Sequence, residues 1–141
     1  MILYLDTSAL VKRYFEEPYS TEVAEQWQQA DEIAISSVAY AEALASFHRK
    51  SREAALDDEI LDEISNNLRS DWQTFIRIQV TDELNTYIDR ALTAHTLRGF
   101  DAIHLASAMI LHEKFAESLR FICFDKKLTQ AAKSEGINTY E

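Results

Sequence analysis

Short apolar runs alternate with longer amphipathic stretches along this chain. The apolar runs predict strands at residues 2–5, 33–35, 75–80, 119–124 and 137–140. The amphipathic stretches predict helices at residues 7–15, 21–29, 38–50, 56–68, 82–98, 101–113 and 126–134. Ser36 or Ser37 is expected to cap the third of these helices and Thr81 the fifth.

Helices separate every pair of predicted strands, and the chain has two glycines and no hairpin turn signal. This order predicts an α/β fold in which a central parallel sheet of about four or five short strands is flanked by helices. A length of 141 residues fits one domain, residues 1–141, that can bury a core without disulfides.

Three acidic residues are each the only Asp, Glu, Lys or Arg in a long run: Asp6 in residues 1–11, Glu42 in 33–47 and Asp101 in 99–111. A fourth, Asp125, closes the apolar segment 121–124. Burying a carboxylate is costly unless hydrogen bonds or a cation offset the desolvation. These runs contain no Lys or Arg that could pair with the acids locally, so a metal ion is the natural candidate for the missing positive charge.

The predicted elements place the acids where ligands commonly bind. Asp6 and Asp125 follow the carboxyl ends of predicted strands, and open α/β sheets bind ligands beyond those ends. Asp101 near a helix start and Glu42 inside an apolar helix can converge there. Singly, Asp6 and Asp101 could be helix caps, Glu42 a half-buried surface residue and Asp125 a turn residue; together the four favour one site.

Composition limits the classes of function. A net charge of −10, from 14 basic and 24 acidic residues, argues against non-specific wrapping of nucleic acid but not against a nuclease. The single cysteine, Cys123, excludes an internal disulfide and a multi-cysteine metal site. No segment has the length or pattern of a membrane span or signal peptide, so we expect a cytoplasmic protein without a membrane partner.

Four segments carry a resemblance to a known family: residues 3–10 around Asp6, 41–44 around Glu42, 97–106 around Asp101 and 124–132 around Asp125. In the order and spacing of their acids, these segments resemble PIN-domain ribonucleases. More narrowly, the chain is similar to the VapC-type toxins of toxin–antitoxin pairs. The resemblance extends from residue 2 to about residue 138, and the segment around Asp101 is its most specific part.

The resemblance implies an endoribonuclease that depends on Mg²⁺, for which Mn²⁺ can substitute, and that inhibits translation. Its catalytic and metal-binding residues would be Asp6, Glu42, Asp101 and Asp125, supported by Ser8 and Thr7. The resemblance also implies an RNA substrate (a tRNA or a ribosomal loop), a cognate antitoxin and a homodimer. Cys123 departs from the pattern, because many relatives have Ser or Thr two residues before the last acid.

Other candidates have structural interpretations. His104 lies in the apolar segment 102–106, which favours a core histidine bonded to the backbone over a general acid. Trp27 and Trp72 could stack RNA bases, but neither lies in a basic cluster, which favours packing. Arg13 and Arg49 are the candidates for guiding RNA phosphates to the metal.

Two other functions fit parts of the pattern. A haloacid-dehalogenase-like phosphotransferase would use Asp6 as a nucleophile, but its phosphatase members have a second Asp where this chain has Ser8. A catalytically silent PIN-like module that only binds nucleic acid or protein would have no need of all four acids.

Overall fold

Four parallel strands form a sheet in the order β3-β2-β1-β4 in the computed structural model, which describes residues 1–140. They are β1 (Ile2–Leu5), β2 (Glu32–Ser36), β3 (Ile76–Ile78) and β4 (Leu119–Ile122). Burial on both faces explains their nearly continuous apolar sequences. The predicted parallel α/β sheet is confirmed.

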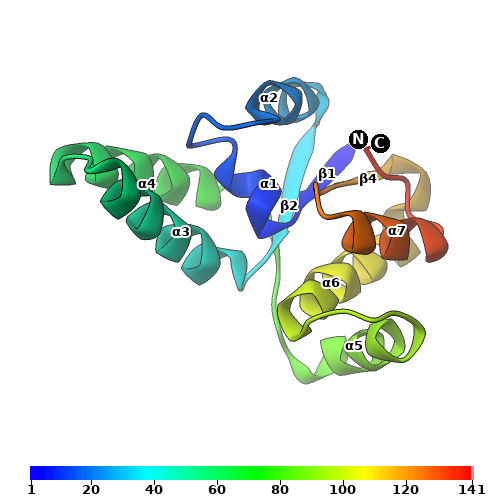
Figure 1. Cartoon of the computed structure of the whole chain (residues 1–141). Helices are drawn as coiled ribbons and strands as arrows, with labels where there is room; N and C mark the ends of the chain where they lie inside the picture. Colours follow the sequence, from blue (N-terminus) through cyan, green and yellow to red (C-terminus); the bar gives the residue numbers. More distant parts are fainter. Residues whose placement is uncertain (141) are drawn as a thin grey trace.

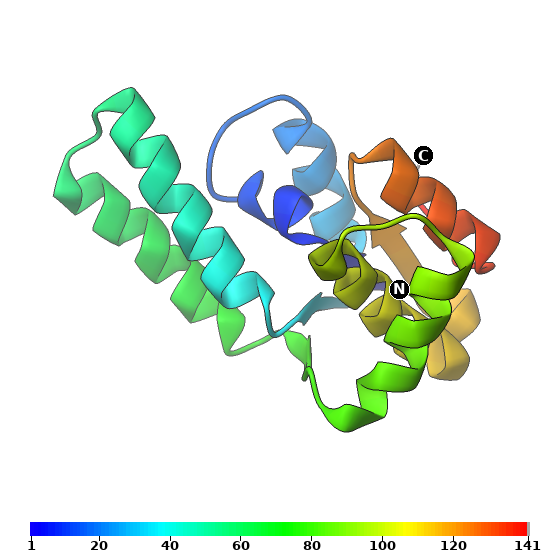
Figure 2. The same ribbon diagram turned by 60° about the horizontal axis from the view of Figure 1, so that its bottom comes forward.

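Seven α-helices and one short 3₁₀ segment connect these strands within residues 1–140: α1 (Thr7–Val11), α2 (Ser20–Gln29), α3 (Ala39–Ala54), α4 (Asp58–Trp72), α5 (Asp82–Ala94), α6 (Gly99–Phe115), η1 (Ala116–Ser118) and α7 (Lys126–Ser134). Figure 1 shows the sheet at the centre, with the α3–α4 pair projecting to one side. Figure 2 shows α3 and α4 lying antiparallel to one another along most of their length.

Alternate residues of β1 belong to two separate hydrophobic clusters. Tyr4 packs with residues of α5, α6 and α7, including Ala91, Leu105 and Leu128. Leu3 and Leu5 pack in a second cluster with residues of α1, α2, α3 and α4. Because successive side chains of a strand point to opposite faces, each face of the sheet has its own helical cover.

Several predicted boundaries are wrong. The first helix ends at Val11, not residue 15, and the fifth ends at Ala94, so Arg98 is the N-cap of α6 instead of the end of α5. Neither Ser36 nor Ser37 is the N-cap of α3; that position is Val38, whose backbone N–H donates to Ser36 Oγ at 3.3 Å.

The last predicted strand is also wrong. In place of a strand at residues 137–140, Thr139 forms an isolated parallel bridge with Phe121. Two backbone hydrogen bonds hold this segment, from Phe121 N–H to Asn138 O and from Tyr140 N–H to Phe121 O, both 2.8 Å. Among residues 1–140, no helix is long and apolar enough to cross a membrane.

Candidate active site

Asp6 stands where β1 passes directly into α1. Its carboxylate caps α1: Oδ1 accepts from the Ala9 backbone N–H at 2.9 Å, and the Ser8 hydroxyl lies 3.0 Å from both carboxylate oxygens. The residue is only 6% exposed. Asp6 is therefore a helix cap, as one of the simple interpretations held, and at the same time a nearly buried acid at the carboxyl edge of the sheet.

Asp125 repeats this arrangement on the neighbouring strand. Leu5 and Ile122 are partners in the β1–β4 register, so both strands leave the sheet at the same edge. Asp125 follows β4 and caps α7, accepting from the Leu128 backbone N–H at 2.9 Å. Unlike Asp6, it is exposed. The two strand ends thus place two carboxylates along one edge, as the sequence predicted.

Glu42 belongs to a hydrogen-bonded network that joins four elements, β1, α1, α3 and α6. Its Oε1 accepts from the Thr7 hydroxyl at 2.6 Å and lies 3.0 Å from Nε2 of His104 on α6. On the other side of the imidazole, Nδ1 lies 3.0 Å from the hydroxyl of Tyr4, which is fully buried in β1. His104 is buried, as predicted, but its partners are side chains of the site and not the backbone; that part of the prediction is wrong.

The pKa of Glu42 reflects this network. Burial acts to raise the pKa of its carboxyl group, but the hydrogen bonds from His104 and Thr7 outweigh burial and lower it. Glu42 is therefore held as a carboxylate with one oxygen oriented. The role of Thr7 in this orientation is more direct than that of Ser8, which serves Asp6.

Asp101 lies in the first turn of α6 and is half-buried. Burial raises its pKa, and the negative charges of Asp125 and Glu42 raise it further. Burial likewise raises the pKa of Asp6, to which the charge of Asp101 adds, against the opposing effects of His104, Ala9 N–H and Ser8. The charges of Asp125 and Glu42 thus act on Asp101, and the charge of Asp101 acts on Asp6, so Asp101 is electrostatically connected to the other three acids.

A pocket of about 470 Å³ opens beside two of these acids. Asp101 and Asp125 line it together with two basic residues, Arg98 and Lys127. The sequence prediction missed both cations, although each lies within three residues of one of the acids. Cations beside clustered carboxylates are suited to hold a substrate phosphate next to a metal ion.

The donor set fits a hard divalent cation. Within residues 1–140, no group of three or more His, Cys, Asp and Glu side chains is already arranged to hold a metal ion. Mg²⁺ does not require such a cage, because it usually binds one or two carboxylates and keeps several waters. Oxygen ligands from Asp6 and Asp101, whose pKa values are raised in the absence of a cation, meet that requirement.

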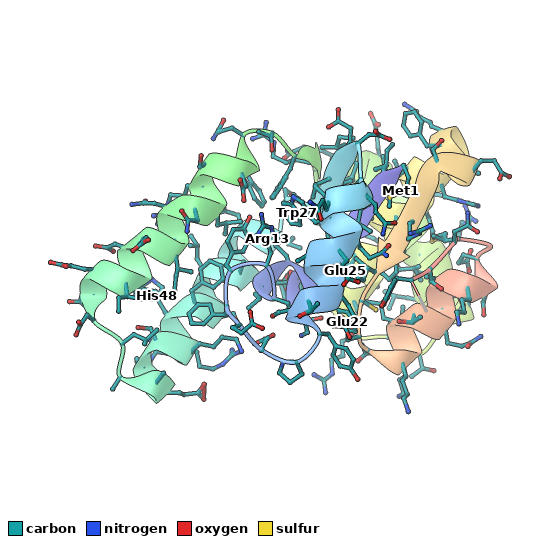
Figure 3. All side chains as sticks on the ribbon, turned by 90° about the horizontal axis from the view of Figure 1, so that it is seen from above. Met1, Arg13, Glu22, Glu25, Trp27 and His48 are labelled. Carbon is teal, nitrogen blue, oxygen red and sulfur yellow. The ribbon has the colours of Figure 1, made fainter. Side chains whose placement is uncertain are left out.

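The structure places the remaining candidates as follows. Arg13 lies over the ring of Trp27, 5.0 Å from its centroid, and the two lie beside one another in Figure 3. Arg49 lies on α3 beyond Glu42 and donates to Ser46 at 3.4 Å. Trp27 and Trp72 both contact Phe75 edge-on and pack against the second hydrophobic cluster, as the packing interpretation predicted.

Thr129 supplies a hydroxyl close to Cys123, the position at which the family resemblance led us to expect Ser or Thr. The Cys123 sulfur lies 3.1 Å from Thr129 Oγ1 on α7. A hydroxyl is therefore present next to Asp125, but it comes from the following helix.

The PIN domain family matches this chain over residues 3–134. The chain belongs to the PIN domain family. The family resemblance read from the sequence is therefore confirmed, and the haloacid-dehalogenase alternative is not retained. Two relatives named ribonuclease VapC45 and ribonuclease VapC49, from two Mycobacterium tuberculosis strains, are each 27% identical to this PIN domain over 135 residues. The match covers 96% of this chain and 92% of each relative.

Solved structures share this PIN fold. FitAcB from Neisseria gonorrhoeae matches with a TM-score of 0.72 and 15% identity, covering 100% of this chain and 97% of that one. VapC20 from Mycobacterium tuberculosis, described as a sarcin-ricin loop cleaving toxin, matches with a TM-score of 0.66 and 15% identity over 92% and 94% of the two chains. VapBC2 from Rickettsia felis, bound to promoter DNA, matches with a TM-score of 0.64 and 16% identity, covering 99% of this chain and 98% of that one.

Proposed function

We propose that this PIN domain is a divalent-metal-dependent endoribonuclease and the toxin of a toxin–antitoxin pair that inhibits translation in the cytoplasm. The observation that carries the proposal is the electrostatic coupling of Asp101 to Asp6, Glu42 and Asp125 in a chain whose curated relatives are named ribonucleases. Burial and neighbouring carboxylates raise the pKa of Asp6 and of Asp101, so a bound cation would stabilise both as carboxylates.

Asp6 and Asp101 are the proposed closest metal ligands, and Glu42 and Asp125 act directly or through water. A bound Mg²⁺, or Mn²⁺ in its place, would supply an activated water and stabilise the leaving oxygen of the phosphodiester. Glu42 keeps its orientation through Thr7 and His104. Arg98 and Lys127, which line the pocket beside Asp101 and Asp125, would bind the phosphates that flank the scissile bond. Arg13 and Arg49, predicted from the sequence for RNA phosphates, would contact the strand elsewhere.

Hydrolysis by an activated water leaves a 5′-phosphate and a 3′-hydroxyl and does not use the 2′-hydroxyl of RNA. The substrate would be a tRNA or a ribosomal loop, as the described target of VapC20 illustrates. The proposed partners are a second copy of the chain and an antitoxin, which would block the acidic site with a basic or bulky side chain. Structural neighbours crystallised as FitAB and VapBC assemblies support the antitoxin.

Cleavage of total cellular RNA and of tRNA-like hairpins tests the proposal. The parent protein with Mn²⁺ is compared with the same protein in EDTA and with Asp101→Asn; Asp89→Asn, on the exposed side of α5, is the matched control. We expect discrete fragments with 5′-phosphates from the parent and Asp89→Asn alone. Folded parent protein that neither binds Mn²⁺ nor cuts RNA would be a silent binding module. Folded protein that binds Mn²⁺ but cuts none of these RNAs would contradict these substrates and leave a narrower RNA target or a silent module.

A further inference from the structure

A second pocket, also of about 470 Å³, is lined by the two residues that flank Asp125 in the chain. Phe124, directly before Asp125, lines this pocket, and Lys126, directly after it, does so too. The other residues used below are Tyr19 and Glu22 at the start of α2, Gln130 on α7, and Tyr140. We name this the aromatic pocket.

Three aromatic rings meet in the aromatic pocket. Tyr19 and Phe124 are stacked, with centroids 4.6 Å apart and planes at 11°. Tyr140 meets Phe124 edge-on at 6.4 Å. Tyr19 is 53% exposed, so much of its ring remains open to solvent although its stacking partner is half-buried. A flat ring held in place and open to solvent can accept another flat ring.

The backbone fixes the position of Tyr19. Its φ of 74° is a left-handed conformation, which is unfavourable for a bulky residue and favours Gly or Asn. The turn that holds it is tied by Ser20 N–H to Glu17 O and by Val23 N–H to Tyr19 O, both 3.0 Å. The ring is therefore presented by a turn whose backbone is hydrogen-bonded at Ser20 and at Val23.

Polar groups around the rings match the rest of a nucleotide. Gln130 offers an amide and Glu22 a carboxylate, both able to bond the edge of a base, while the Lys126 ammonium can reach a phosphate. Lys12 lies over the Phe124 ring, 5.3 Å from its centroid, and its ammonium is paired with Glu17 at 3.0 Å. Lys126 is therefore the lysine that would bind a phosphate. Figure 3 shows Glu22 near the start of α2, facing the α7 side of the molecule.

We propose that the aromatic pocket receives one unstacked base of the RNA strand, next to the phosphate held at the carboxylates. The inference rests on the proposed ribonuclease function. Stacked aromatics, hydrogen-bonding side chains and a lysine line this pocket, and Phe124 and Lys126 flank Asp125 in the chain. This combination favours a nucleotide over a protein segment, since single-stranded RNA is bound by base stacking and phosphate contacts together. Tyr19 is then the stacking platform and Lys126 the contact to a neighbouring phosphate.

The test compares two labelled strands of equal length: hexauridylate and a hexamer of abasic ribose phosphates. Their affinities are measured by fluorescence anisotropy in Ca²⁺, with strand integrity checked on gels. The parent should bind hexauridylate about tenfold more tightly, the range expected for stacking of one base. Tyr19→Asn, which tolerates the left-handed backbone, should lose this preference and bind the abasic strand as the parent does.

Two controls accompany this comparison. Tyr19→Phe keeps the ring and should keep the preference, as should Phe115→Ala, which removes an exposed ring at the end of α6. Equal affinity of the parent for both strands would overturn the inference and leave the aromatic pocket to a protein partner. That comparison uses the parent alone and does not depend on how any variant folds.

The outcome is separable from that of the proposed function. A parent that prefers hexauridylate through Tyr19 but cuts no RNA would retain the base pocket and remove the ribonuclease proposal. A parent that cuts RNA but binds both strands equally would retain the ribonuclease proposal and remove the base pocket.

Discussion

The imidazole Nε2 of His104 on α6 lies 3.0 Å from Oε1 of Glu42 on α3. Because α3 and α6 cover opposite faces of the sheet, this contact passes around its edge at the point where β1 ends. The contact orients an acid of the candidate active site by means of a buried core histidine. Core packing and the site are thus directly connected.

Removing His104 should destabilise the protein and raise the pKa of Glu42. In His104→Ala, Tyr4 loses one of its buried hydrogen-bond partners and Glu42 loses one of two, which should lower the free energy of unfolding by about 2–3 kcal/mol. The pKa of Glu42 should rise because a hydrogen bond that lowers it is gone. Urea unfolding and carboxyl-carbon NMR titration measure the two effects. His48→Ala, exposed on the same helix α3, should change neither (Figure 3).

The positions of Asp6 and Asp125 could be predicted from the sequence because they depend on local patterns. Each follows an apolar run, and parallel strands end at a common edge. The helix α7 was predicted at its observed bounds from its amphipathic pattern, whereas the cap at Asp125, predicted only as a turn residue, comes from the structure. The family resemblance supplied the order of the acids and thereby joined Glu42 and Asp101 to these two.

The network around His104 could not be predicted from local patterns. Tyr4 and His104 are separated by 100 positions, and only tertiary packing brings them together. An apolar neighbourhood does predict that a histidine is buried, but it does not predict which partner satisfies its ring nitrogens. The strand predicted at residues 137–140 failed for a related reason: among residues 1–140, the segment pairs with β4 at Phe121 alone, and a local pattern does not predict how many residues of a neighbouring strand pair with it.

Asp101→Asn should stabilise the metal-free protein at neutral pH. Burial and the charges of Asp125 and Glu42 raise the pKa of Asp101 from 3.8. Between the unfolded and the folded pKa values, the folded protein therefore holds a proton on Asp101 that the unfolded protein has lost, and at higher pH the folded protein must bury the charge. A raised pKa contributes stability at low pH that is lost as pH rises through the folded value. Melting temperatures in EDTA should therefore be higher for Asp101→Asn than for the parent at pH 7, and the difference should vanish near pH 4.

Divalent metal should reverse this order. Millimolar Mg²⁺ or Mn²⁺ should raise the melting temperature of the parent, because an ion that binds only the folded state stabilises it. It should do so far less for Asp101→Asn, whereas Asp89→Asn should respond as the parent does. Equal melting temperatures of parent and Asp101→Asn in EDTA, with no response of the parent to metal, would contradict the clustered-acid site.

Cys123 should be unreactive in the folded protein. Burial, together with the negative charges of Asp6 and Asp125, raises the pKa of its thiol to about 12, so the thiolate that reacts with alkylating agents is scarce. Alkylation by iodoacetamide at pH 8 should be at least a hundredfold slower than in 8 M urea, as measured by intact mass. Rapid labelling of folded protein would show that the Cys123–Thr129 contact opens readily and that the chain next to Asp125 is less rigid than the packing implies.

Metal binding should release protons. Burial and neighbouring acids raise the pKa values of Asp6 and Asp101. A cation bound at these oxygens would lower both pKa values, because it favours the ionised carboxylates. Affinity for Mn²⁺ should therefore increase with pH through the range in which these groups still hold protons. Calorimetric titration in two buffers of different ionisation enthalpy measures the number of protons released. In Asp101→Asn the number should fall, because an amide has no proton to lose at that position. An unchanged number would place the titrating group elsewhere and remove Asp101 from the metal site.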